Sequence, residues 1–231
     1  MKNPSEVSIA LETGATTTAL VYPGAGEGAS GRAALVLAHG AGAGQRSAFM
    51  VDFAAALSDL GLDVVTFNFL YTEQRRKIPD RAPALEACYR AVIAAVRDRL
   101  ESARRALFIG GKSMGGRIAT QVAAAESSLP IAGLVLLGYP LHPPGKPAER
   151  RDKHLPSVSR PMLFVQGTRD AFGTPDELTP LLQTLDPAPM LYPVAQGDHS
   201  FKLSRRDPAA QAAIYDGIQR VIADWVRALA P

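Results

Sequence analysis

The chain has 231 residues, 47% of them hydrophobic and 20% charged, which is ordinary for a globular protein with one buried α/β core. Its net charge is only +3, and its arginines stand in small separate clusters, so nothing indicates a nucleic-acid partner. One cysteine, Cys88, excludes a disulfide framework, and without a long apolar run we expect no membrane partner and a cytoplasmic location.

The first part of the chain is rich in β-forming residues. Val7–Ile9 and 16–22 are predicted to pair as edge strands. The continuous apolar run 34–38 predicts a strand that is covered on both faces. Apolar residues at helical spacing predict a helix over 47–60, and Gly61 suits its C-terminal end.

A glycine pattern precedes the run 34–38. Gly26, Gly28 and Gly31 spell the Gly-x-Gly-x-x-Gly of a dinucleotide-binding site. A strand follows them, whereas that site requires a helix whose N-terminus receives the phosphates. We therefore interpret the pattern as a surface loop.

The remaining elements alternate between strand and helix. Strands are predicted at 64–67, 107–109, 133–137, 162–166 and 189–192, and helices at 82–102, 117–125, 175–185 and 208–229. The segment 68–80 is expected to be a polar connection, and the proline-rich segment 139–159 an irregular, substrate-facing excursion. This order predicts a three-layer α/β/α sandwich with a mostly parallel sheet, in one domain over 1–231.

The stretch from Leu107 to Arg117 carries the strongest functional signal. An apolar strand runs into Gly111-Lys112-Ser113-Met114-Gly115, and a helical pattern follows at once. A strand that turns abruptly into a helix strains the middle residue and requires small neighbours. The Ser113 hydroxyl would then stand beside a helix N-terminus that favours negative charge. The pattern predicts a nucleophile elbow.

The letters Gly111-Lys112-Ser113 also resemble the end of a phosphate-binding P-loop. That motif needs a glycine at position 106, where the chain has Ala106. It also needs a loop over 107–109, which reads as buried strand. These two mismatches argue against a P-loop.

Polar residues follow three of the predicted strands. Ser113 comes after 107–109, Asp170 after 162–166 and His199 after 189–192. Because ligands gather at the carboxyl ends of parallel strands, we expect the three to meet. A histidine can take the proton of a serine hydroxyl, and an acid behind it fixes its tautomer. The chain order Ser, Asp, His is the one this architecture uses, and it predicts a catalytic triad.

Supporting residues follow from the same chemistry. The backbone N–H groups of Ala41, in the glycine-rich loop after 34–38, and of Met114 are the expected oxyanion donors. Asp176 and Asp198 compete with Asp170 for the orienting role. Asp176 suits the start of a helix, and the side chain of Asp198 would tend to point away from its neighbour His199.

Five segments together resemble the α/β-hydrolase superfamily: Gly-Lys-Ser-Met-Gly-Gly-Arg, His-Gly-Ala-Gly-Ala, Gly-Asp-His-Ser, 138–144 and 163–170. More narrowly, they look like its small lid-less branch near the dienelactone hydrolases, whose eukaryotic relatives include the hydrolase-like domain of an NSL chromatin-complex subunit. The resemblance covers roughly 16–229 and implies an eight-stranded sheet and an acyl-hydrolase site on Ser113, Asp170 and His199. Dienelactone hydrolases carry cysteine at the elbow, so their substrate is not inherited.

We therefore expect a serine hydrolase that cleaves a small ester, thioester or related acyl compound, with no metal or organic cofactor. The absence of a large insertion between the strands 133–137 and 162–166 favours an open site without a lid, in a monomer or homodimer. The candidates for the pocket wall are His39, Arg117, Tyr139, His142 and Phe172, although His39 also suits a structural role in its loop. The alternative function is a binding or scaffold protein that keeps this fold without turnover.

Overall fold

The computed structural model describes residues 3–25, 33–204 and 207–230, so the glycine pattern at Gly26, Gly28 and Gly31 lies outside the described residues. Eight strands form one sheet in the order β1-β2-β4-β3-β5-β6-β7-β8. The strands are β1 (Ser5–Ala10), β2 (Thr16–Tyr22), β3 (Ala34–Ala38), β4 (Asp63–Phe67), β5 (Leu107–Lys112), β6 (Gly133–Leu137), β7 (Met162–Gly167) and β8 (Met190–Val194). Only β1 with β2 and β2 with β4 run antiparallel, which confirms the mostly parallel sheet.

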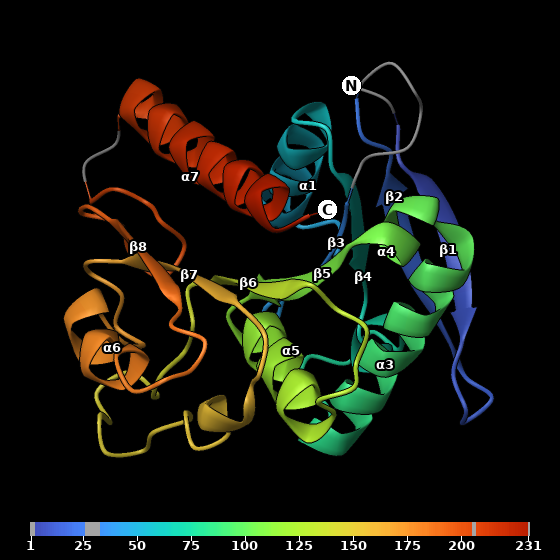
Figure 1. Cartoon of the computed structure of the whole chain (residues 1–231), viewed down its shortest axis with the longest axis horizontal. Coiled ribbons are helices and arrows are strands. Elements are labelled where there is room, and N and C mark those ends of the chain that lie inside the picture. Colours follow the sequence, from blue (N-terminus) through green and yellow to red (C-terminus); the bar gives the residue numbers. More distant parts are fainter. Residues whose placement is uncertain (1–2, 26–32, 205–206, 231) are drawn as a thin grey trace.

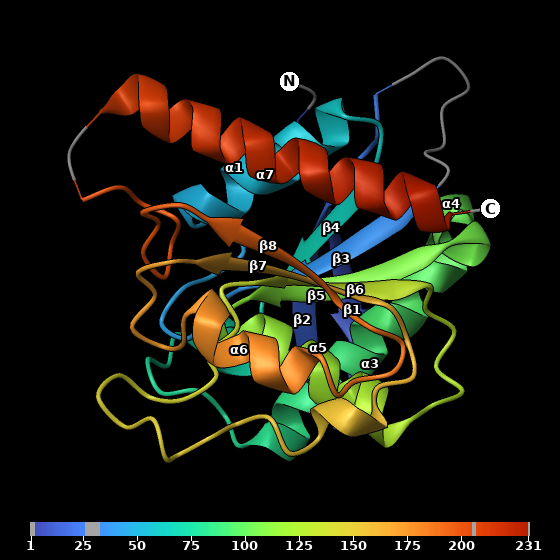
Figure 2. The same ribbon diagram turned by 60° about the vertical axis from the view of Figure 1, so that its left-hand side comes forward.

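Helices cover both faces of this sheet, as Figure 1 shows. They are α1 (Ala48–Asp59), α2 (Leu70–Glu73), α3 (Ala82–Arg99), α4 (Glu101–Arg105), α5 (Met114–Ala125), α6 (Pro175–Leu182) and α7 (Pro208–Leu229). In both ribbon views α1 and α7 lie on one side, and α3, α5 and α6 on the other (Figures 1 and 2). No helix in the described ranges is long and apolar enough to cross a membrane.

The sheet separates two hydrophobic cores. Successive side chains of a strand point to opposite faces, so Leu35 packs in the core beneath α1 and α7, whereas Val36 packs in the core beneath α3 and α5. Every residue of β3, β5 and β6 is buried, which explains why these strands read as continuous apolar runs.

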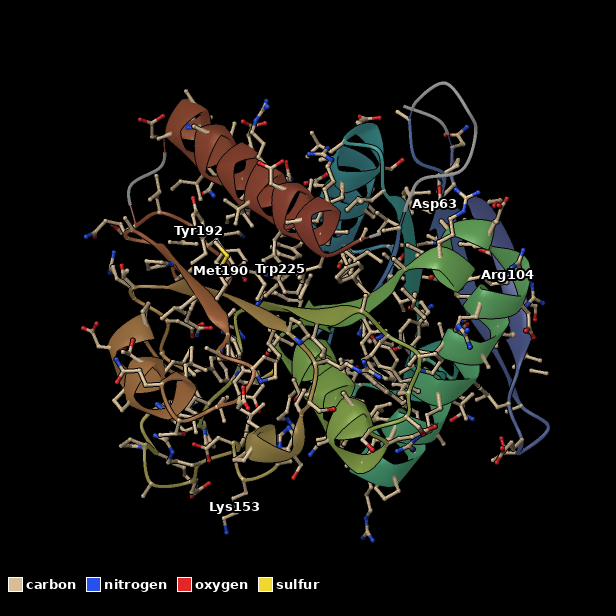
Figure 3. All side chains as sticks on the ribbon, viewed as in Figure 1. Asp63, Arg104, Lys153, Met190, Tyr192 and Trp225 are labelled. Carbon is tan, nitrogen blue, oxygen red and sulfur yellow. The ribbon has the colours of Figure 1, made fainter. Side chains whose placement is uncertain are left out.

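Trp225 fixes α7 against the sheet. Figure 3 shows it between α7 and the strands, and its ring meets Phe108 edge-on with the centroids 5.7 Å apart. A Cβ atom on Gly133 would come within 2.8 Å of the indole, so the absence of a side chain on β6 allows this close packing.

Three expectations about local structure need correction. β2 is not an edge strand, because it pairs with β4 as well as with β1. The helix predicted over 82–102 breaks at Leu100, whose backbone is extended, and the hydroxyl of buried Ser102 then donates to Asp63 at 2.5 Å. The connection 68–80 contains α2, which buries Tyr71.

Candidate active site

The turn between β5 and α5 holds Ser113 in a strained conformation. Its φ of 52° and ψ of −114° are unusual for a residue with a side chain. Cβ atoms on Gly111 and on Gly115 would each lie 2.3 Å from the carbonyl oxygen of Ala38. Glycine is required at both positions, because the turn packs directly on the backbone of β3. This close packing presents Ser113 at the carboxyl end of the sheet.

The structure brings Ser113, His199 and Asp170 into one hydrogen-bonded row. The Ser113 Oγ lies 2.8 Å from the His199 Nε2, and the His199 Nδ1 lies 2.8 Å from the Asp170 Oδ2. An ionised carboxylate only accepts, so the tautomer that fits donates from Nδ1 and leaves Nε2 free to take the serine proton. The Asp170 side chain is fully buried, while that of His199 is 22% exposed.

The three acids that the sequence left in competition differ in their contacts. Asp170 meets the imidazole, and its Oδ1 accepts from the N–H of Phe172 at 2.8 Å. Asp198 instead accepts from the N–H groups of Ser200 and Lys202, which occupies its carboxylate within its own loop. Asp176 lies in the first turn of α6. The geometry therefore favours Asp170 as the partner of the histidine.

Gln166 joins the loops behind this row, and the sequence analysis missed it. Its Nε2 donates to the Asp170 Oδ2 at 2.9 Å and to the Gly173 carbonyl at 2.6 Å. Its Oε1 accepts from the N–H of Tyr139 at 2.8 Å. A buried amide that serves several loops orients Asp170. The available signal was a polar residue at the end of an otherwise apolar strand.

A cleft of about 690 Å³ opens above Ser113. Its lining includes Ala41, Met114, Arg117 and Phe172, and the Phe172 ring stacks on that of His199 with the centroids 4.2 Å apart. The loop that carries Ala41 packs on the elbow, since a Cβ atom on Gly40 would lie 3.5 Å from the Ser113 Cβ. Within the described part of the chain, the N–H groups of Ala41 and Met114 donate to no protein acceptor.

His39 does not line the cleft, so its predicted place in the pocket wall is wrong. Its ring is fully buried, and its Nε2 accepts from the N–H of Phe69 at 3.2 Å. This leaves the proton on Nδ1, which donates to the Gly40 carbonyl at 2.8 Å. Burial lowers the pKa of His39, so the ring stays neutral. Through these two hydrogen bonds, His39 holds the loop that carries Ala41 in place.

Tyr139 and His142 are also buried and absent from the cleft lining, which corrects their predicted place in the wall. The Tyr139 hydroxyl donates to the Arg151 carbonyl at 2.7 Å. The His142 ring lies between the Pro143 carbonyl at 2.8 Å and Glu177 at 3.1 Å. Both side chains anchor the segment 139–159, and packing beneath the loop hides them from the cleft.

Lys112, directly before Ser113, is a buried cation that the sequence analysis did not single out. Its Nζ has no hydrogen-bond partner among the described residues and lies about 6 Å from the rings of Phe49 and Phe201. Burial lowers the pKa of its ammonium group to about 8, although Asp170 and Asp198 oppose this effect. A charged residue at the end of a buried strand was the visible signal.

Comparison with known proteins gives matches over most of the chain. A family model described as alpha/beta hydrolase domain matches residues 31–227. A lid-less serine hydrolase from Xanthomonas campestris has 21% identity and a TM-score of 0.71, with 96% of each chain covered. A dienelactone hydrolase from Anabaena variabilis has 20% identity and a TM-score of 0.74, with 100% of each covered. An esterase from Pyrococcus furiosus has 14% identity and a TM-score of 0.75, with 99% of this chain and 92% of that one covered.

The TM-scores of 0.71, 0.74 and 0.75 show that this chain shares its fold with the three proteins. The fold is similar to those of a lid-less serine hydrolase and a dienelactone hydrolase, as the sequence motifs indicated. The likeness to the NSL-complex subunit stays an expectation from the sequence.

Proposed function

Because the chain belongs to the alpha/beta hydrolase domain family, we propose that it is a serine hydrolase that cleaves small esters, thioesters or related acyl compounds through an acyl-enzyme on Ser113. The observation that carries this proposal is the hydrogen-bonded row, 2.8 Å from Ser113 to His199 and 2.8 Å from His199 to Asp170. The proposal also takes residues 1–231 as one domain, since all the described strands join one sheet.

The row defines an order of events. His199 Nε2 takes the hydroxyl proton while the Ser113 Oγ bonds to the substrate carbonyl carbon. The carbonyl oxygen becomes an oxyanion, which the N–H groups of Ala41 and Met114 stabilise. His199 gives its proton to the leaving group as the ester bond breaks. Water then attacks the acyl-enzyme with His199 again as base, which releases the acid and restores Ser113.

Asp170 acts through His199 in this scheme. Its buried carboxylate holds Nδ1 protonated and stabilises the imidazolium that forms in each half of the cycle. Gln166 and the N–H of Phe172 also donate to this carboxylate and fix its orientation. The oxyanion donors and Asp170 are thus set before substrate binds, which is what preorganised catalysis requires.

The shape of the cleft supports a small substrate. The segment between β6 and β7 contributes Pro140 and Arg151 to the wall and contains only one short 3₁₀ turn, Leu155–Ser157. It forms no helical cover over Ser113. Ester hydrolysis of p-nitrophenyl acyl chains of increasing length is therefore expected to be fastest for the short chains.

A fluorophosphonate probe and p-nitrophenyl acetate test the proposal together. We expect labelling of Ser113, and a loss of kcat/KM of roughly 10⁴-fold or more in Ser113→Ala and in His199→Ala. Ser127→Ala is the matched control, because this serine lies exposed in the turn after α5. If folded protein resists the probe and His199→Ala changes no rate, the site is not hydrolytic and the scaffold alternative stands.

A further inference from the structure

Two arginines reach the cleft from different elements. Arg117 lies on α5, one turn beyond Ser113, and its N–H donates to the Ser113 carbonyl at 3.1 Å. Arg151 belongs to the segment 139–159 and is held at both backbone ends. Its N–H donates to the Leu141 carbonyl at 2.8 Å, and its carbonyl accepts from the Tyr139 hydroxyl at 2.7 Å. Both residues line the cleft at Ser113.

Neither arginine forms an ion pair with a carboxylate in the described part of the chain. Arg150, the residue before Arg151, does form an ion pair, because its Nε lies 2.6 Å from the Asp152 Oδ2. Asp80 is the acidic residue of the cleft lining, and Arg76 already holds it at 2.6 Å. Within the described residues, the cleft lining thus offers these two guanidinium groups no free carboxylate.

The side chain of Arg117 is partly buried, so leaving its N–H donors without an acceptor costs free energy. Among the described residues its Nε is buried without an acceptor, and its Nη1 reaches only the Gln121 side chain, at 3.4 Å. Burial lowers the pKa of Arg117, and the nearby guanidinium of Arg151 lowers it further, while Tyr139 and Glu86 oppose them. Glu86 itself lies 3.4 Å from Arg90 on the same helix. Buried donors and two like charges together favour binding of an anion.

His154 is a further ionisable group near Arg117, and it carries no charge there. His154 lies 2.8 Å from the Thr120 hydroxyl, and burial together with the Arg117 charge lowers its pKa to about 4. The ring is therefore neutral at pH 7 and adds neither a counter-charge nor a second cation.

From these contacts we propose that Arg117 and Arg151 bind a carboxylate group of the substrate, so that the preferred substrates are acyl esters with a negative charge a few bonds from the scissile carbonyl. The planar fork of a guanidinium matches a carboxylate in two parallel hydrogen bonds. The reaction is the hydrolysis described above, with the carboxylate unchanged. This inference rests on the proposed function and adds its substrate class.

A pair of esters with the same leaving group tests it: mono-p-nitrophenyl glutarate and the neutral p-nitrophenyl pentanoate. We expect kcat/KM to be at least tenfold higher for the glutarate, and this ratio to fall as salt rises. In Arg117→Gln and in Arg151→Gln the ratio is expected to drop roughly tenfold each. Arg150→Gln is the matched control and keeps the ratio, since Arg150 is absent from the cleft lining.

The possible outcomes separate this inference from the proposed function. If both esters react and the two arginine variants leave the ratio unchanged, the carboxylate site is wrong and the hydrolase stands. If neither ester reacts and Ser113 resists a fluorophosphonate, the hydrolase fails and this inference with it. Thermal unfolding shows whether each variant folds. Should Arg117→Gln unfold, Arg151→Gln decides the matter, because its side chain lies on the irregular segment.

Discussion

The elbow from Leu107 to Arg117 and the segment 139–159 both border the cleft, but they are built in different ways. All of β5 is buried, and its glycines meet the backbones of both neighbouring strands. The segment 139–159 has no strand, and hydrogen bonds from Tyr139 and His142 tether it. Ser113 thus stands on backbone that close packing between strands fixes, while Arg151 stands on irregular chain that hydrogen bonds hold.

The largest expected effect is that of a methyl group inside the elbow. In Gly110→Ala the new Cβ would lie 1.9 Å from the Val135 carbonyl oxygen of β6 and 2.7 Å from the Val135 carbonyl carbon, so the backbone of β6 leaves it no space. We expect a loss of about 4 kcal/mol or more in the free energy of unfolding, or no folded protein at all. Urea unfolding followed by circular dichroism measures this. A loss under about 1 kcal/mol would mean that the backbone of the elbow can shift to accept the methyl group. The elbow would then be no more rigid than the segment 139–159.

A substitution of Lys112 is expected to stabilise the protein, whereas Gly110→Ala is expected to destabilise it. Its pKa falls from 10.5 to about 8 on folding, so the folded state binds its proton less tightly than the unfolded state does. The resulting cost is complete below pH 8 and fades as the pH rises toward 10.5. We therefore expect Lys112→Met to raise the free energy of unfolding by up to about 3 kcal/mol at pH 7, and by less at pH 10.

Urea unfolding at the two pH values checks the Lys112 prediction. Lys153→Met is the control, because Lys153 points away from the fold in Figure 3 and is exposed. A Lys112→Met protein that is less stable than the original at pH 7 would show that the ammonium group has a stabilising partner.

Tyr89 supports the elbow from beneath. Its hydroxyl donates to the Gly110 carbonyl at 2.7 Å and accepts from the Gly110 N–H at 3.0 Å, all of it buried. Tyr89→Phe would remove both of these buried hydrogen bonds, so we expect a loss of about 1–3 kcal/mol in the free energy of unfolding. Tyr192→Phe is the matched control, since this tyrosine is only half-buried on β8. Equal effects in the two variants would contradict a specific support of Gly110.

The same contrast explains what the sequence could predict. The buried strands β3 and β6 and the amphipathic α7 match their predicted bounds, because hydrophobic periodicity is a local property of the chain. The break at Leu100 depends on Ser102 reaching Asp63, a contact between residues far apart in sequence. The pairing of β2 with β4 is equally nonlocal. No local pattern carries such information.

The candidate site divides in the same way. The Gly-x-Ser-x-Gly turn could be recognised in the sequence because its backbone geometry permits few residue types. The loops with Asp170 and His199 could be placed because each follows a strand that hydrophobic periodicity predicts. The wall was predicted less well: His39, Tyr139 and His142 are buried, while Arg151 was not among the candidates. Irregular chain has no period, so the sequence does not show which of its side chains face a cleft.

The smallest expected effect comes from the same substitution as the largest, placed in the segment 139–159. Gly145 has a φ of 73°, and a Cβ atom there would meet nothing within 4 Å. Gly145→Ala therefore adds backbone strain without a clash, which is expected to cost about 1 kcal/mol, and kcat/KM for p-nitrophenyl acetate should not change. Unfolding and kinetics of this variant beside Gly110→Ala separate the two causes. If Gly145→Ala abolished folding as well, the segment would be as rigid as the elbow, and Arg151 would stand on a frame as fixed as that of Ser113.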